Sequence, residues 1–141
     1  MVAIGADHGG FLLKEEVKKY LDENKIKYKD FGVFNGEKSD YPIVAKKVAN
    51  VVADNNSEFK FGLLFCGTGL GMALAANKVN GIRAVCLTDS YSAKFSRLHN
   101  NANILCLGGR VVGVGLAEEL ISIFLTTPFE GGRHEKRLNM I

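Results

Sequence analysis

Short apolar runs alternate with amphipathic stretches along the whole chain, and this alternation limits the possible folds more than any other feature. The apolar runs have the length and composition of buried strands, although the second is weak. They span residues 2–5, 28–32, 61–66, 82–87 and 103–108. Helical periodicity fills the intervals, at residues 11–24, 42–55, 69–78, 90–98 and 113–125. Strands that alternate with helices predict an α/β sandwich of three layers, with a five-stranded parallel sheet between two helical layers.

The loops that follow the predicted strands are the first places to search for chemistry. Ligands of open parallel sheets bind beyond the carboxyl ends of the strands. Four of the predicted strands end in loops rich in glycine or polar residues, which read ADHGG, CGTGLG, TDSYS and GGRVVG in chain order.

The length and charge of the chain narrow the classes of protein to consider. With 141 residues it fits one domain, residues 1–141, around a single core. The net charge is +3 and basic residues alternate with acidic ones, so no continuous basic stripe predicts nucleic-acid binding. No apolar run approaches the ~20 residues that a membrane-spanning helix needs, and we expect no membrane segment.

The cysteines indicate a reducing compartment. Cys66, Cys86 and Cys106 are odd in number, widely spaced and without the spacing of metal ligands. The chain also begins directly with a strand-like segment instead of a charged and apolar leader. We therefore expect a cytoplasmic protein with reduced thiols. Cys86 and Cys106 lie inside apolar runs and are predicted to be small hydrophobic core residues.

Cys66 differs, because it stands where a buried strand meets a glycine-rich loop. The amides of residues 67–71 could form an anion-binding nest at the start of the next helix. A tight strand-to-helix turn explains the glycines equally well. A thiol of ordinary pKa, about 8.5, ionises more readily when such amides face it. The pattern favours Cys66 as a base or nucleophile at neutral pH.

Polar residues elsewhere admit both a functional and a structural interpretation. Asp7 and His8 follow the first strand and could bind a sugar hydroxyl and a phosphate, or Asp7 could cap the next helix. His99 lies near the start of the fifth strand; an imidazole suits proton transfer near neutral pH, although a single histidine is often merely packed. Arg133 and Arg137 could grip a phosphate from one helical face, or belong to a solvated tail.

Five segments, in order over nearly all of the chain, carry a resemblance. They read ADHGGFLLKE, DYP, CGTGLGMALAANKVNGIRAV, HNNANILCLGGR and FEGGRHEKR. Each is weak alone, but their combination closely resembles the ribose-5-phosphate isomerase type B family, in a wider group with the two subunit types of galactose-6-phosphate isomerase. The resemblance implies a Rossmann-like α/β/α sandwich that needs no metal or organic cofactor. It also implies a homodimer or a dimer of dimers, with active sites formed by both chains and residues 127–141 packing at the dimer interface.

The resemblance further implies an aldose-ketose isomerase that interconverts ribose 5-phosphate and ribulose 5-phosphate in the pentose phosphate pathway. Cys66 would be the base, the Thr68 hydroxyl would assist proton transfer to an oxygen, and His99 would open the furanose ring. Asp7 would hold the ring hydroxyls. The enediolate oxygens would be bound by the amides of Gly67, Thr68, Gly69, Leu70 and Gly71. His8, Arg133 and Arg137 would bind the phosphate. Arg110 and Asn100 would make the remaining substrate contacts.

Three alternatives remain open at the level of sequence. The same proton transfer would serve a hexose-6-phosphate isomerase acting on allose or galactose 6-phosphate. A regulatory module could bind a phosphate or nucleotide at the glycine loop, with Cys66 incidental. A redox sensor could use Cys66, although no resolving cysteine lies at an obvious spacing.

Overall fold

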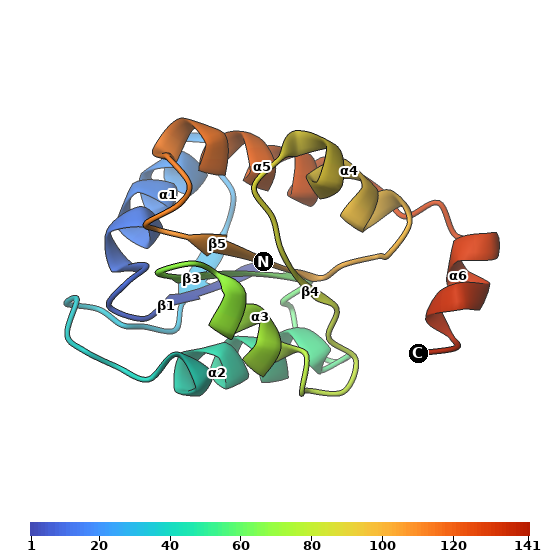
Figure 1. The fold of residues 1–141 in the computed structure, drawn as a ribbon, viewed down its shortest axis with the longest axis horizontal. Helices are drawn as coiled ribbons and strands as arrows, with labels where there is room; N and C mark the ends of the chain where they lie inside the picture. Colours follow the sequence, from blue (N-terminus) through green and yellow to red (C-terminus); the bar gives the residue numbers. More distant parts are fainter.

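The computed structural model describes residues 1–141 and shows a sheet between two layers of helices (Figure 1). The strands are β1 (Val2–Ala6), β2 (Tyr28–Asp30), β3 (Phe61–Cys66), β4 (Ala84–Cys86) and β5 (Ile104–Gly108). The helices are α1 (Phe11–Glu23), α2 (Tyr41–Ala53), α3 (Leu70–Ala76), α4 (Ser90–Leu98), α5 (Val114–Thr126) and α6 (Arg133–Leu138). All strand pairs are parallel, in the order β2-β1-β3-β5-β4, which confirms the predicted sandwich.

The two edge strands are shorter than the sequence predicts. β2 and β4 each cover three residues, and each has a ladder partner on one side only. Beyond β2 the chain still bonds to β1, since the amide of Phe31 donates to the carbonyl of Ile4 at 2.8 Å and that of Val33 donates to the carbonyl of Ala6 at 2.6 Å. Gly32 has a φ of 107°, outside the range of a strand, so these residues do not continue the regular strand. The central strands β1, β3 and β5 lie within one residue of their predicted ends.

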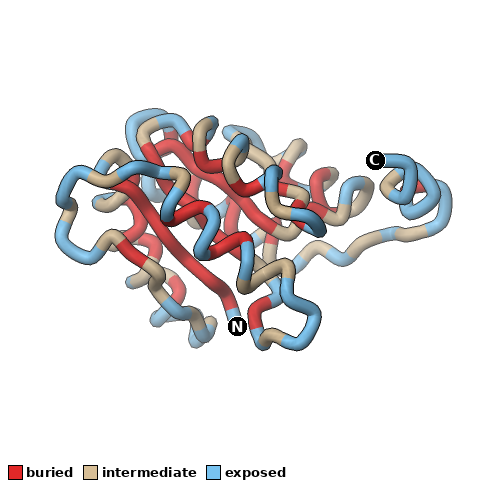
Figure 2. The backbone as a smooth tube through the Cα atoms, turned by 90° about the horizontal axis from the view of Figure 1, so that it is seen from below, coloured by how far each residue is buried: buried red, intermediate tan, exposed pale blue.

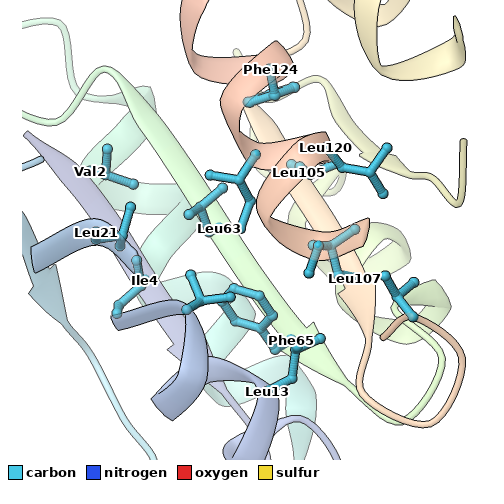
Figure 3. Close-up of a cluster of buried hydrophobic side chains, with 14 of the residues drawn as sticks. Val2, Ile4, Leu13, Leu21, Leu63, Phe65, Leu105, Leu107, Leu120 and Phe124 are labelled. Carbon is cyan, nitrogen blue, oxygen red and sulfur yellow. The ribbon is translucent and has the colours of Figure 1, made fainter. Parts of the chain in front are cut away.

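Both faces of the central strands are buried. On one face, Leu63 and Phe65 pack in a cluster with side chains of α1 and α5, among them Leu13, Leu120 and Phe124 (Figure 3). The helices α2 and α3 cover the other face, where a second cluster forms. Each fully buried large apolar side chain contributes about 1.5–3 kcal/mol. Burial on two faces explains why these strands read as continuous apolar runs.

Cys106 belongs to this second cluster and is fully buried, so the prediction of a structural role is confirmed. Burial raises the pKa of the Cys106 thiol well above its ordinary value. A neutral buried thiol behaves as a small apolar side chain.

The sheet has two distinct ends. The carboxyl ends of its strands share one edge, and the chain reverses its direction of travel across the sheet between β1 and β3, where open parallel sheets usually bind ligands. Helix α6 and the carboxyl terminus stand beside the sandwich, near the opposite edge (Figures 1 and 2). No helix combines the length and the hydropathy that crossing a bilayer requires.

Candidate active site

Asp7 lies at the carboxyl end of β1 and is held rigidly. Its carboxylate oxygen Oδ1 accepts hydrogen bonds from the amides of Gly9, at 2.8 Å, and Gly10, at 3.1 Å. Its own amide donates to the carbonyl of Phe65 on β3, at 3.1 Å. The N-cap residue of α1 is Gly10, so the alternative prediction that Asp7 caps this helix is wrong. Asp7 instead orders the turn that precedes the helix.

Gly10 is required by close packing at this turn. A Cβ atom at this position would lie 2.2 Å from the carbonyl carbon of Phe65. The loops after β1 and β3 therefore touch through their backbones, which brings Asp7 beside the start of the glycine-rich loop.

Cys66 is the last residue of β3 and is buried. Its sulfur accepts a hydrogen bond from the amide of Gly69 at 3.0 Å. Gly69 is the N-cap of α3 and has a φ of 82°, a left-handed conformation that favours glycine. The Thr68 hydroxyl oxygen accepts from the amide of Leu70 at 3.3 Å. The loop is thus both a tight turn and a set of amides near the thiol, so the two interpretations of its glycines hold together.

Cys86 lies close to the same loop, which the sequence did not indicate. Its sulfur donates to the carbonyl of Thr68 at 3.3 Å, and a Cβ atom on Gly69 would lie 2.8 Å from it. Cys86 is half-buried, and burial, followed by the influence of Cys66, raises the pKa of its thiol. Cys86 therefore supports the loop as a neutral side chain. It packs against the second cluster without being fully buried in it, so the predicted core position is confirmed only in part.

Three further side chains surround the loop. The guanidinium of Arg110 lies over Gly67, since a Cβ atom there would be 3.1 Å from Nη1, and the Arg110 amide donates to the Gly67 carbonyl at 3.0 Å. The Tyr41 ring covers Gly71, since a Cβ atom on Gly71 would lie 2.7 Å from Cζ of Tyr41. The exposed His8 accepts from the amide of Ser39 through Nδ1 at 3.4 Å. We call Asp7, His8, residues 66–71 and Arg110 the cysteine half-site.

His99 lies in a second group, at the C-cap of α4. Its ring stacks on that of His134, with centroids 3.9 Å apart and an interplanar angle of 12°. The Glu130 carboxylate lies 3.9 Å from Nε2 of His99 and 3.4 Å from Nε2 of His134. A hollow of about 330 Å³ is lined by His99, Asn100, His134, Arg137, Leu138 and Ile141. We call His99, Asn100, Glu130, Arg133, His134 and Arg137 the histidine half-site.

His134 is buried, whereas Arg133 and Arg137 are exposed on α6. Its Nε2 atom has no hydrogen-bond partner. Burial, followed by the nearby His99 and Arg133, lowers the pKa of His134. This imidazole is therefore neutral at neutral pH.

The two half-sites lie at opposite ends of the sheet within one chain (Figure 1). Cys66 is paired in register with Gly108, the last residue of β5. His99 ends a helix that leads back to the beginning of that strand, at Ile104. Four residue steps along a strand span about 13 Å, too far for two side chains to act on one sugar carbon. A single chain therefore assembles each half-site but does not unite them.

The sequence did not single out Glu130 and His134 of the histidine half-site, or Tyr41 beside the glycine-rich loop. Glu130 and His134 are four residues apart in FEGGRHEKR, and Tyr41 belongs to DYP. The i, i+4 spacing of Glu130 and His134 could have indicated that they act together. It gives no sign of His99, on which His134 stacks, because His99 is distant in the sequence.

One group of side chains could hold a metal ion. His99, Glu130 and His134 offer ligand atoms within 4.8 Å of one another. A metal bound to histidine lies in the plane of the imidazole ring, near 2.0–2.1 Å from nitrogen. The stacked rings have nearly parallel planes, so one ion cannot lie in both unless a ring rotates. The arrangement is not a preformed metal centre.

Comparison with known proteins places the chain in a family. Residues 2–141 match the family model described as Ribose/Galactose Isomerase. Ribose-5-phosphate isomerase B of Escherichia coli is 45% identical over 140 residues, with 99% of this chain and 93% of that protein covered.

Two solved structures have the same fold. Ribose-5-phosphate isomerase B of Clostridium thermocellum gives a TM-score of 0.94 at 47% identity, covering 99% of this chain and 93% of that one. The ribose 5-phosphate isomerase of Thermotoga maritima gives 0.94 at 48% identity, covering 99% and 94%. Because the matched residues reach from one end of the fold to the other and include both half-sites, this chain belongs to the ribose/galactose isomerase family.

Proposed function

We propose that the protein is a ribose-5-phosphate isomerase, an aldose-ketose isomerase that interconverts D-ribose 5-phosphate and D-ribulose 5-phosphate. The observation that carries the proposal is the Cys66 thiol at the end of β3, 3.0 Å from the Gly69 amide and beside Asp7 and Arg110. The similarity to the ribose-5-phosphate isomerases of Escherichia coli and Clostridium thermocellum supports the proposal, because those proteins are named for this reaction.

The proton transfer follows from the loop. Cys66, as a thiolate, removes the proton from C2 of the open-chain aldose and returns it to C1. Between these steps the substrate is a cis-enediolate, whose oxygens receive hydrogen bonds from the amides of residues 67–71. The Thr68 hydroxyl carries the proton that must pass between O2 and O1. Fixed amides stabilise the developing charge without reorganisation, which is the largest contribution in many such reactions.

The other side chains bind and prepare the sugar. His99 donates a proton to the ring oxygen of the furanose, and Asp7 binds ring hydroxyls. His8, Arg133 and Arg137 hold the phosphate. Asn100, from the histidine half-site, and Arg110, from the cysteine half-site, complete the substrate contacts. Phosphate binding far from C1 and C2 lets part of its energy orient the reacting carbons.

The proposal includes a homodimer in which the cysteine half-site of one protomer faces the histidine half-site of its partner. The separation of about 13 Å along β5 supports this arrangement. Leu70 and Leu74, one turn apart on α3, are 59% and 69% exposed, as is expected of a face that is covered in an assembly. Residues 127–141, which stand beside the sandwich, would pack against the partner. A dimer of dimers preserves the same sites.

The proposed setting is the cytoplasm and the pentose phosphate pathway. All three cysteines are unpaired, which favours a reducing compartment. A thiolate base also requires that Cys66 stay reduced.

The test is conversion of ribose 5-phosphate by the purified protein with EDTA present, beside allose 6-phosphate as a second substrate. Cys66→Ala should reduce turnover by about 10³-fold or more while substrate still binds. Cys86→Ser, a matched change in the neighbouring thiol, should stay within about threefold of the original rate. Conversion of the hexose alone would overturn the substrate assignment, and activity on neither sugar would favour a binding module.

A further inference from the structure

Glu130 is attached to the end of α4 by its backbone. Its amide donates to the carbonyl of Leu98, the residue before His99, at 3.1 Å. The Glu130 side chain therefore has a fixed origin beside the His99 ring. Its Oε2 atom reaches both imidazoles, 3.9 Å from His99 and 3.4 Å from His134.

The His99 ring is restrained on three sides. Phe95, one turn earlier on α4, meets it edge to face with centroids 4.7 Å apart. His134 covers one ring face, and Glu130 lies beyond Nε2. The remaining side opens into the hollow of about 330 Å³. An imidazole otherwise rotates broadly about its last side-chain torsion, so these contacts define the direction in which it presents a proton.

We propose that Glu130 and His134 are positioning residues that hold the His99 ring in orientation for opening the sugar ring. This inference rests on the proposed function, because His99 acts on a ring only if the substrate is a cyclic aldose phosphate. It adds two residues to the reaction and gives each a separate task. His134 sets the plane of the ring, and Glu130 stabilises its positive charge.

The electrostatics support this division. The charged and titratable groups facing the histidine pair are Glu130 from the segment before α6, and Arg133 and Arg137 from α6 itself. Glu130 is the carboxylate among them, so it opposes the two guanidinium groups. The buried His134 has no hydrogen-bond partner for Nε2 and a lowered pKa, so it does not compete with His99 for the Glu130 carboxylate as a charged group. A carboxylate within about 4–6 Å favours the charged form of an imidazole.

The ring-opening step needs no reactant other than water. His99 gives its proton to ring oxygen O4 as the C1–O4 bond breaks. The electrons of the O1–H bond form C1=O1, and the proton leaves to water. Water then returns a proton to His99. The product is the open-chain aldehyde that Cys66 requires.

The test compares the conversion of ribose 5-phosphate with the exchange of the C1 proton of ribulose 5-phosphate for solvent deuterium. In ribulose 5-phosphate, O5 is esterified and the ketone cannot close into a furanose, so this exchange needs Cys66 and the enediolate but neither ring opening nor ring closure. Glu130→Gln should lower kcat/KM for ribose 5-phosphate about tenfold and change the exchange rate less than about twofold. His134→Ala should act in the same direction, and His134→Phe should recover part of the loss because it preserves the stack.

Two controls separate this inference from the proposed function. Glu135→Gln removes an exposed carboxylate from α6, five residues after Glu130, and should change neither the conversion nor the exchange. NMR spectra of the histidine rings, assigned with His8→Asn and His134→Phe, report the contact between His99 and Phe95 whether or not the protein is active. Glu130→Gln should weaken the nuclear Overhauser effects between these two rings, because the His99 ring then rotates more freely.

The outcomes are distinct. Equal losses of conversion and exchange, or unchanged contacts between the His99 and Phe95 rings in Glu130→Gln, would overturn the positioning role even if the protein is an isomerase. Lack of any isomerase activity in the unmodified protein would instead refute the proposed function. In that case the ring contacts seen by NMR alone decide whether Glu130 holds His99.

Discussion

The amide nitrogen of Gly69 lies 3.0 Å from the sulfur of Cys66, and the left-handed conformation of Gly69, with a φ of 82°, directs it there. A Cβ atom on Gly69 would be strained and would also lie 2.8 Å from the sulfur of Cys86. We therefore expect Gly69→Ala to displace the loop and to lower kcat for ribose 5-phosphate by about 10²-fold, the typical loss for one misplaced donor. Steady-state kinetics check this prediction.

Gly81 provides the matched control. It also has a positive φ, 86°, but a Cβ atom there would meet only the Cβ of Ala53, at 3.9 Å. Gly81→Ala should cost about 1 kcal/mol of unfolding free energy from backbone strain and leave kcat unchanged. A similar loss of kcat in both variants would mean that the Gly69 effect reflects general destabilisation.

Two inactive variants should restore activity when their subunits are mixed. Cys66→Ala removes the base from one half-site, and His99→Asn removes the acid from the other. In a hybrid dimer with sites between subunits, one site carries both substitutions and the other carries neither. Random mixing makes about half of the dimers hybrids, so unfolding and refolding the variants together should recover about one quarter of the original activity.

The separate proteins and a mixture combined without subunit exchange serve as controls for this experiment. Activity that stays at the level of the single variants after proven exchange would show that each site is formed by one chain. The dimer arrangement under "Proposed function" would then be wrong, although the isomerase chemistry could stand.

Lys14 should be a major determinant of stability. Its side chain is fully buried on α1, and Nζ donates to both carboxylate oxygens of Asp30, at 2.9 and 2.7 Å. Lys14→Met would leave that carboxylate with Lys18, 3.4 Å away, as its remaining cation. We expect a loss of about 2–4 kcal/mol, measured by urea unfolding. Lys19→Met, which breaks an exposed pair with Glu16, should leave the unfolding free energy nearly unchanged.

Asp89 should make the stability of the protein depend on pH in the acid range. Its carboxylate caps α4 by accepting from the Ser92 amide at 2.7 Å, and this hydrogen bond lowers the pKa of Asp89. A pKa that is lower in the folded state stabilises the protein above the ordinary value, about 3.9, and the contribution disappears as pH falls through the folded value.

Asp89→Ala should therefore lower the unfolding free energy at about pH 7, and its difference from the original protein should shrink toward about pH 3. Urea unfolding across this range measures the effect. Asp89→Asn keeps an acceptor for the cap and should be less destabilising at neutral pH. A difference that is constant with pH would show that the charge of Asp89 does not contribute.

The sequence by itself determined the architecture, because the pattern of apolar residues reports burial directly. β1, β3 and β5 are buried on both faces, so they appear as continuous apolar runs with well-defined ends. The edge strands β2 and β4 are less buried and were predicted too long. Cys66 could also be found from sequence, since a strand end followed by glycines is a local feature.

Only the tertiary structure decided which of the candidate residues meet. Asp7, Cys66 and Arg110 converge because parallel strands bring their carboxyl ends to one edge of the sheet. His99 belongs to the opposite edge because a crossover helix runs back against the strands, and there it stacks on His134 from the end of the chain. Such contacts depend on the direction of each element in space, which hydrophobic periodicity does not encode. For the same reason the separation of Cys66 and His99 along the sheet becomes visible only in the fold.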